Sequence, residues 1–147
     1  ICLFACNDNK KTNTHQVESV KIKDSVVAAP TQNLVLQDSA NFTTIQWIDS
    51  MYKDVGEIKN GTKLPLSFKF KNTGNKVLII DSVWAECGCT VLEIAKKTFE
   101  PNTTGDIKAV FDTKNQAVAT HEKRIFVKTN TTPHTGSVLT FKAKVIE

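Results

Sequence analysis

The stretch that decides the fold runs from Leu64 to Asn75 and reads LPLSFKFKNTGN. Apolar and polar side chains alternate along Leu64–Asn72, which is the period of a half-buried β-strand. One face of that strand carries Leu66, Phe68 and Phe70, and the other carries serine and lysines. The residues that follow, Asn72–Asn75, favour a turn. This stretch therefore predicts a strand with one face in a core and one in water.

The same pattern recurs on both sides of this strand. Turn residues such as Asn60-Gly61 separate further short strands, which we expect at Thr43–Asp49, Val55–Ile58, Lys76–Ala85, Val91–Ile94, Ile107–Phe111, Arg124–Asn130 and Leu139–Val145. A helical turn is expected at Met51–Asp54. About seven or eight short antiparallel strands in ~105 residues are typical of an immunoglobulin-like β-sandwich. The all-β alternative is a small barrel.

Length and composition exclude several classes of protein. The 147 residues carry a net charge of +4 and are 40% hydrophobic, which is enough for a packed core. No apolar run approaches the ~20 residues of a membrane-spanning helix. The lysines are spread along the chain, so we expect no nucleic-acid partner. The sequence has no P-loop, GxGxxG, GxSxG or HExxH motif, and we expect no cofactor.

The first residues resemble the end of a bacterial lipoprotein signal peptide. Ile1–Cys6 reads ICLFAC, and polar residues begin directly after the second cysteine. Leu3–Cys6 fits the lipobox, in which a small residue precedes the cysteine that is acylated and becomes the new N-terminus. Residues 1–5 are then a signal-peptide remnant and Cys6 is the lipidation site, which makes the membrane a partner through the anchor. The alternative is a cloning artefact or a buried N-terminal strand.

A polar segment separates this site from the predicted domain. We assign residues 6–40 to a lipidated flexible tether, because they hold too little apolar surface to fold, and residues 41–147 to the immunoglobulin-like domain. Ser25 and Ser39 lie in Asp-Ser-small or Asp-Ser-apolar triplets, which resemble a short bacterial O-glycosylation motif. Asn7–Asn9 is not the acidic run of a surface-export signal, so the periplasmic side of the outer membrane is favoured.

A series of short motifs resembles one bacterial family. The motifs are Gly56–Ile58, Phe68–Gly74, Leu78–Ile80, Cys87–Thr90, Pro101, Gly105–Ile107, Phe111–Thr113 and Lys123–Asn130. Together they resemble the immunoglobulin-like family called domain of unknown function 1573, over roughly Trp47–Val145. The resemblance implies an envelope lipoprotein without enzymatic activity. Two positions depart from it: Asn102 and Ala143 stand where the family has glycine. Asparagine also tolerates a left-handed turn, so the turn at Asn102 should persist.

Cys87 and Cys89 are the cysteines left for the folded domain. We expect them to be small packing residues at the end of a strand, with Gly88 in a bulge. A disulfide is the second interpretation, although residues i and i+2 of a strand lie at the limit of bridging range. A redox pair or a soft-metal site is the third, but CxC lacks the ligand count of a zinc site. Trp84 is expected in the core.

Two functions from different classes fit these observations. The first is a non-enzymatic, lipid-anchored binding or assembly module with an envelope protein or glycan as its partner, bound through loops or at a sheet edge. The alternative is a redox or metal-handling envelope lipoprotein that uses the Cys87/Cys89 pair. The histidines (His15, His121 and His134) are expected to be solvated. Alternating lysines at 69, 71, 108, 128, 142 and 144 predict either a basic sheet face or ordinary solvated faces.

Overall fold

The chain forms a two-layer β-sandwich. The computed structural model describes residues 39–132 and 136–147. A short 3-10 turn, Ser39–Asn41, precedes the strands. The strands are β1 (Ile45–Trp47), β2 (Tyr52–Lys59), β3 (Lys63–Asn72), β4 (Leu78–Ala85), β5 (Thr90–Glu93), β6 (Thr98–Phe99), β7 (Thr104–Asp112), β8 (Thr120–Thr129) and β9 (Ser137–Ile146). The immunoglobulin-like sandwich expected from the sequence is confirmed.

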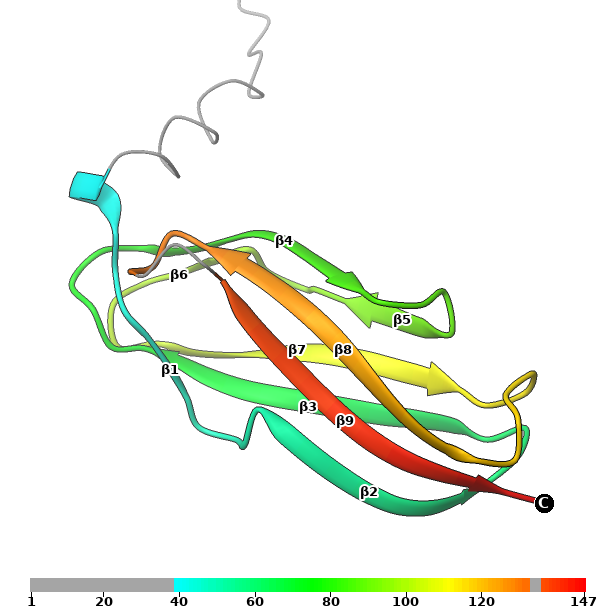
Figure 1. Cartoon of the computed structure of the whole chain (residues 1–147). Coiled ribbons are helices and arrows are strands. Elements are labelled where there is room, and N and C mark those ends of the chain that lie inside the picture. The colour runs from blue at the N-terminus through cyan, green and yellow to red at the C-terminus, as the bar shows by residue number, and fades with distance from the viewer. Residues whose placement is uncertain (1–38, 133–135) are drawn as a thin grey trace, which may run out of the picture.

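The strands divide into two sheets that share one long axis (Figure 1). The four-stranded sheet has the order β1-β3-β7-β5, and the five-stranded sheet has the order β2-β9-β8-β4-β6. The 3-10 turn lies at one end of the sandwich, while the β4–β5 connection and the C-terminus lie at the other end (Figure 1). In the part of the chain that is described, no helix is long and apolar enough to cross a membrane.

The core lies between the sheets and follows the alternation seen in the sequence. On β3, Leu66, Phe68 and Phe70 are buried, whereas the lysine between the two phenylalanines is exposed. The neighbouring strand β7 contributes Ile107 and Phe111. The facing sheet contributes the other large buried side chains, which are Leu78, Ile80, Ile125, Val127, Leu139, Phe141 and Val145. Alternate residues of each strand point into the space between the two sheets, and together they form one continuous core.

The N-terminal strands differ from the expectation. Met51–Asp54 is not a helical turn, because Tyr52–Asp54 begins the eight-residue strand β2. β2 also pairs with β9 in parallel, whereas the other strand pairs in the described residues are antiparallel. The reason is that β1 pairs with β3 in the four-stranded sheet, and the chain then crosses to the five-stranded sheet and forms β2 without reversing its direction. It therefore meets β9 running the same way.

The turn at Asn102 confirms one detail of the sequence argument. Asn102 has a φ of 63°, in the left-handed region where glycine and asparagine are favoured. Its backbone N–H donates to the Asn72 carbonyl at 2.9 Å, so the turn is tied to the end of β3. The left-handed turn expected at Asn102 is therefore confirmed.

Candidate functional site

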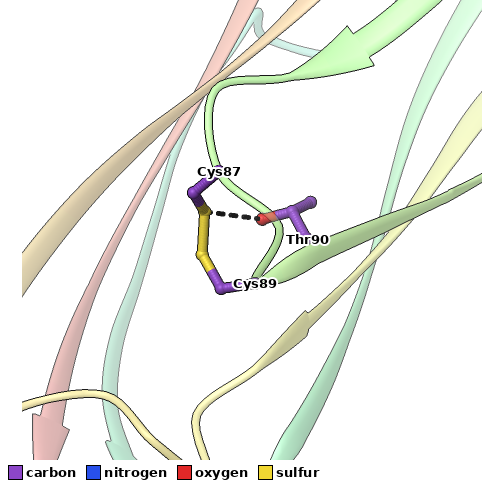
Figure 2. Close-up of a disulfide and its surroundings, with 3 residues drawn as sticks. All are labelled: Cys87, Cys89 and Thr90. Atoms are coloured by element: carbon purple, nitrogen blue, oxygen red, sulfur yellow. Dashed lines mark hydrogen bonds between the residues drawn. A yellow bond between two sulfur atoms is a disulfide. The ribbon is translucent and has the colours of Figure 1, made fainter.

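A disulfide closes the turn between β4 and β5. Figure 2 shows the bond between Cys87 and Cys89, which are separated by one residue. Their Cα atoms are 5.3 Å apart, less than the ~6.5 Å expected for such residues in an extended strand. The turn brings them together. Gly88 is exposed, and a Cβ built on it would meet nothing within 4 Å. One side of the turn therefore faces open solvent.

The disulfide is the second of the three interpretations that the sequence allowed. The sequence favoured two packed thiols, because residues i and i+2 of an extended strand lie at the limit of disulfide geometry. No local feature of the sequence indicates how tightly the chain turns between Cys87 and Cys89. Cys89 does also pack against the core, as that interpretation expected. Within residues 39–132 and 136–147, no group of three or more His, Cys, Asp or Glu side chains is placed to hold a metal ion. The redox role of the pair stays a prediction.

The two sulfurs have different surroundings. Cys89 borders a shallow hollow that is also lined by Gly88, Asp112, Lys114, Asn115 and Gln116. A backbone hydrogen bond of 2.9 Å from Asp112 N–H to the Cys89 carbonyl joins the turn to the end of β7, where the β7–β8 loop begins. The Sγ atom of Cys87 instead lies 3.9 Å from Oγ1 of Thr90 (Figure 2). Cys89 therefore borders an open hollow that carries a lysine and an aspartate, and the Cys87 sulfur has a hydroxyl group as its neighbour.

An apolar row lies on the outer face of the five-stranded sheet, close to this turn. Trp84, Phe126 and Val138 occupy neighbouring positions on β4, β8 and β9. The rings of Trp84 and Phe126 are stacked, with centroids 5.2 Å apart and an interplanar angle of 14°. Trp84 is 49% exposed and Val138 is 45% exposed. We call these three residues the outer apolar row.

The prediction that Trp84 belongs to the core is wrong. The pairing of β4 with β8 shifts between Ile80 and Ser82, which marks a β-bulge at Asp81. A bulge adds one residue to the strand, so the alternation of side chains is reversed beyond it. Ile80 points inward before the bulge and Val83 is packed against the core after it. Trp84 is consequently turned to the outer face.

The β4 strand has an open edge beside this row. Glu86 N–H donates to the Arg124 carbonyl at 3.0 Å. Because hydrogen-bonded pairs recur at every second residue of an antiparallel ladder, the backbone groups of Val83 and Ala85 point away from β8. β6 pairs only with the first two residues of β4. No strand of the described residues pairs with Val83–Ala85 on that side.

Ion pairs flank the outer apolar row. Arg124 contacts Glu86 through two hydrogen bonds, of 3.1 and 2.7 Å. These bonds hold the pKa of the Glu86 carboxyl below its ordinary value and raise the pKa of Arg124. Farther along the sheet, a hydrogen bond from Lys142 lowers the pKa of Asp54. These groups are exposed, so each pair contributes little stability, but together they fix the charge pattern of the face.

The alternating lysines do not form one basic face. Lys69, Lys71 and Lys108 lie on strands of the four-stranded sheet, whereas Lys128, Lys142 and Lys144 lie on the five-stranded sheet. The two groups therefore face opposite sides of the sandwich. Acidic partners lie within 4.0 Å of four of these lysines, which are Lys108, Lys128, Lys142 and Lys144. The interpretation as solvated sheet faces fits this arrangement.

The remaining candidate residues are dispersed or lie outside the described residues. Cys6, Ser25, His15 and His134 are outside residues 39–132 and 136–147, so the structure does not place them. Ser39 is exposed at the start of the 3-10 turn. His121 is half-buried rather than fully solvated. Its Nε2 lies 2.8 Å from the Ala117 carbonyl and its ring centroid 6.1 Å from that of Phe111. None of these residues joins the disulfide site.

Sequence reasoning missed the neighbours of the disulfide. Thr90 follows the CGC motif directly, and a contact between residues three apart in a turn could have been expected. Lys114 and Asn115 come from the β7–β8 loop, and nothing local in the sequence connects them with Cys89. Phe126 was missed as a partner of Trp84, because the register of β4 against β8 depends on the bulge.

The two-sheet fold defines a class of protein, the immunoglobulin-like β-sandwich domain. Within that class the chain belongs to the family described as "Protein of unknown function (DUF1573)", whose profile matches residues 45–145. The sequence resemblance to this family is therefore confirmed. No curated protein matches the chain.

Solved structures agree on the fold. A Porphyromonas gingivalis W83 protein of unknown function is similar with a TM-score of 0.64 at 16% identity, over 73% of this chain and 49% of that one. The ASH / PapD-like domain of human CEP192 is similar with a TM-score of 0.54 at 9% identity, over 91% of this chain and 99% of the domain. The chain thus spans about half the length of the Porphyromonas protein. At these identities the likeness shows the fold alone.

Proposed function

We propose that the chain is a non-enzymatic binding or assembly module of the bacterial cell envelope, anchored by lipid at Cys6 on the periplasmic side of the outer membrane. One observation carries the proposal: the outer apolar row of Trp84, Phe126 and Val138 ends at the open edge of β4. A contiguous apolar row that contains a half-exposed tryptophan, beside unpaired backbone groups of a strand edge, is typical of a surface that a partner covers.

The geometry favours an extended protein segment as the partner. The N–H and C=O groups of Val83 and Ala85 are directed to the edge, where a strand of another chain could pair with them. Since Phe126 covers one face of the Trp84 ring, the other face remains for a side chain of that strand. Trp84 would then serve as the anchor of the interface.

The position of the edge also fits an anchored module. The described chain begins at the end of the sandwich that is opposite to the β4–β5 turn (Figure 1). A lipid at Cys6 would attach through the N-terminal end, so the tether would leave the sandwich at the end opposite to the β4–β5 turn and would not cover it. Partners in the envelope could reach it there.

Site-specific photo-crosslinking tests the binding surface. A benzoylphenylalanine at Ser82, on the β4 edge, should give a discrete adduct in living cells, whereas the same group at Lys71, on the opposite outer face, should not. Adding Trp84→Ser should reduce the Ser82 adduct about thirtyfold, because a buried tryptophan anchor is worth ~2 kcal/mol or more. The matched control is Val91→Ser, which removes another exposed apolar side chain, 58% exposed, from the four-stranded sheet. Equal adducts at Ser82 and Lys71 would count against the proposal.

Metabolic labelling tests the anchor. A precursor carrying Cys6→Ser should lose all incorporation of an alkyne fatty acid and move from the membrane fraction to the soluble periplasm. Two or three acyl chains hold a protein firmly, whereas an unacylated chain has no such attachment. Cys2→Ser is the control and should change neither property. Retained label in the Cys6→Ser chain would remove the anchor from the proposal.

A further inference from the structure

The Cys87–Cys89 disulfide is built to be opened from one side, and this goes beyond the proposed binding function. The bond spans a single exposed glycine at the tip of a turn, and no residue beyond the two cysteines comes within 4 Å of a Cβ at that position. The turn lies at the rim of the sandwich, outside the buried core residues of β4 and β5. Cys87 and Cys89 are both half-buried and Gly88 between them is exposed, so an incoming thiol can approach the bond at this turn without unfolding the domain.

The surroundings of the two sulfurs assign different roles to them. Cys89 borders the hollow, which lies between the β4–β5 turn and the β7–β8 loop and is also lined by Lys114. Asp112 lines the same hollow, and its carboxylate is engaged by Lys63 Nζ at 4.0 Å and by the Lys114 N–H at 2.9 Å. The Lys114 ammonium group therefore favours the approach of a thiolate, because the attacking species is an anion. Cys87 has the Thr90 hydroxyl 3.9 Å from its sulfur, and a hydroxyl group can donate a hydrogen bond to a thiolate as it leaves.

We propose that the pair is a thiol–disulfide exchange site for a dithiol protein, with Cys89 as the attacked sulfur and Cys87 as the leaving group. A thiolate of the partner attacks Cys89 Sγ, the Cys89–Cys87 bond breaks, and Cys87 leaves as a thiolate that takes up a proton. The second thiol of the partner then attacks the partner's own sulfur in the mixed disulfide and releases Cys89. The partner dithiol loses two electrons and becomes a disulfide, and the Cys87–Cys89 pair gains them.

Rapid acid quenching tests the assigned polarity. The probe is reduced glutathione, added to the folded full chain with Cys2→Ser and Cys6→Ser so that the pair alone reacts. We expect reduction without loss of the β-sheet circular dichroism signal, and a trapped mixed disulfide that peptide mapping places on Cys89 at least five times as often as on Cys87. Equal trapping on both cysteines, or reduction only in denaturant, would overturn the proposal.

Two substitutions separate the proposed role from a merely structural one. Lys114→Gln should slow the glutathione reaction about threefold, the size of an exposed charge interaction, and added salt should remove the difference. Lys76→Gln is the matched control, since Lys76 is exposed at the other end of β4. Thr90→Val should slow bond opening while Cys89 remains the trapped residue. An unchanged rate in both Lys114→Gln and Thr90→Val would overturn the assignment even if the pair is reducible.

Discussion

Replacing Asn72 by alanine is expected to lower the free energy of unfolding by about 3–4 kcal/mol. The Asn72 side chain is fully buried and makes four hydrogen bonds. Its Oδ1 accepts from the Thr43 hydroxyl at 2.9 Å and from Gly74 N–H at 3.1 Å. Its Nδ2 donates to the carbonyls of Lys76 and Phe99, at 2.8 and 2.9 Å. Thr43 and Phe99 are buried. Alanine would leave the Thr43 hydroxyl and the Phe99 carbonyl without this partner, which costs more than the loss of an exposed bond.

Urea unfolding of the full chain with Cys2→Ser and Cys6→Ser measures this effect. Asn75→Ala is the matched control, because Asn75 is exposed in the same turn, and it should change stability by less than about 0.5 kcal/mol. Asn72→Asp should be at least as damaging as alanine, since it keeps the acceptor but turns a carboxyl oxygen toward two carbonyls. A loss below about 1 kcal/mol for Asn72→Ala would show that water replaces these bonds easily.

The prediction illustrates what the sequence could reveal about the fold. The strand that carries Asn72 was the easiest to predict, because its two faces differ completely in polarity. The central role of Asn72 was not predictable, since asparagine before Thr-Gly is also the signature of an ordinary exposed turn. Its partners come from the segment before β1, from the β3–β4 turn and from β6. Only the tertiary structure brings these three segments together.

The β4 strand shows where the alternation of residues in a sequence does not predict which side chains are buried. Lys76–Ala85 is apolar on both faces, so the sequence could not reveal which side chains point inward. A single bulged residue then reversed the alternation and moved Trp84 to the surface. The strand was therefore predicted correctly, but the exposed position of Trp84, on which the proposed binding surface depends, was not. The parallel pairing of β2 was hidden similarly, because a crossing between sheets has no local signature.

The disulfide site was half-predictable. The CGC motif identified the two cysteines, and strand geometry placed a disulfide at the limit of what is allowed. The tight turn removes that limit. The asymmetry between the sulfurs depends on Lys114, which lies 25 positions after Cys89 in the sequence and returns to it through β7. The two cysteines suggested disulfide chemistry from the sequence. Which of the two sulfurs is attacked depends on neighbours that only the topology brings together.

Gly105→Ala is the second substitution with a large expected effect on stability, about 2–3 kcal/mol. Gly105 lies on β7 opposite Phe70, and a Cβ built on it would contact the Phe99 ring and approach Cζ of Phe70 to 2.6 Å. The two phenylalanine rings pack edge to face with centroids 4.9 Å apart. Both are buried, so neither ring can move away without opening a gap elsewhere in the core.

Thermal unfolding followed by circular dichroism measures the cost, and Gly88→Ala provides the matched control. A Cβ at Gly88 meets nothing within 4 Å, so that substitution tests the change from glycine to alanine without a clash. Gly88→Ala is expected to be neutral or slightly stabilising, because alanine reduces the conformational freedom of the unfolded chain. Gly105→Ala combined with Phe99→Leu should recover part of the loss, since the smaller side chain gives the new methyl group room. Equal stability of the Gly105→Ala and Gly88→Ala chains would mean that the aromatic pair adapts without strain, and that close packing does not require glycine at this position.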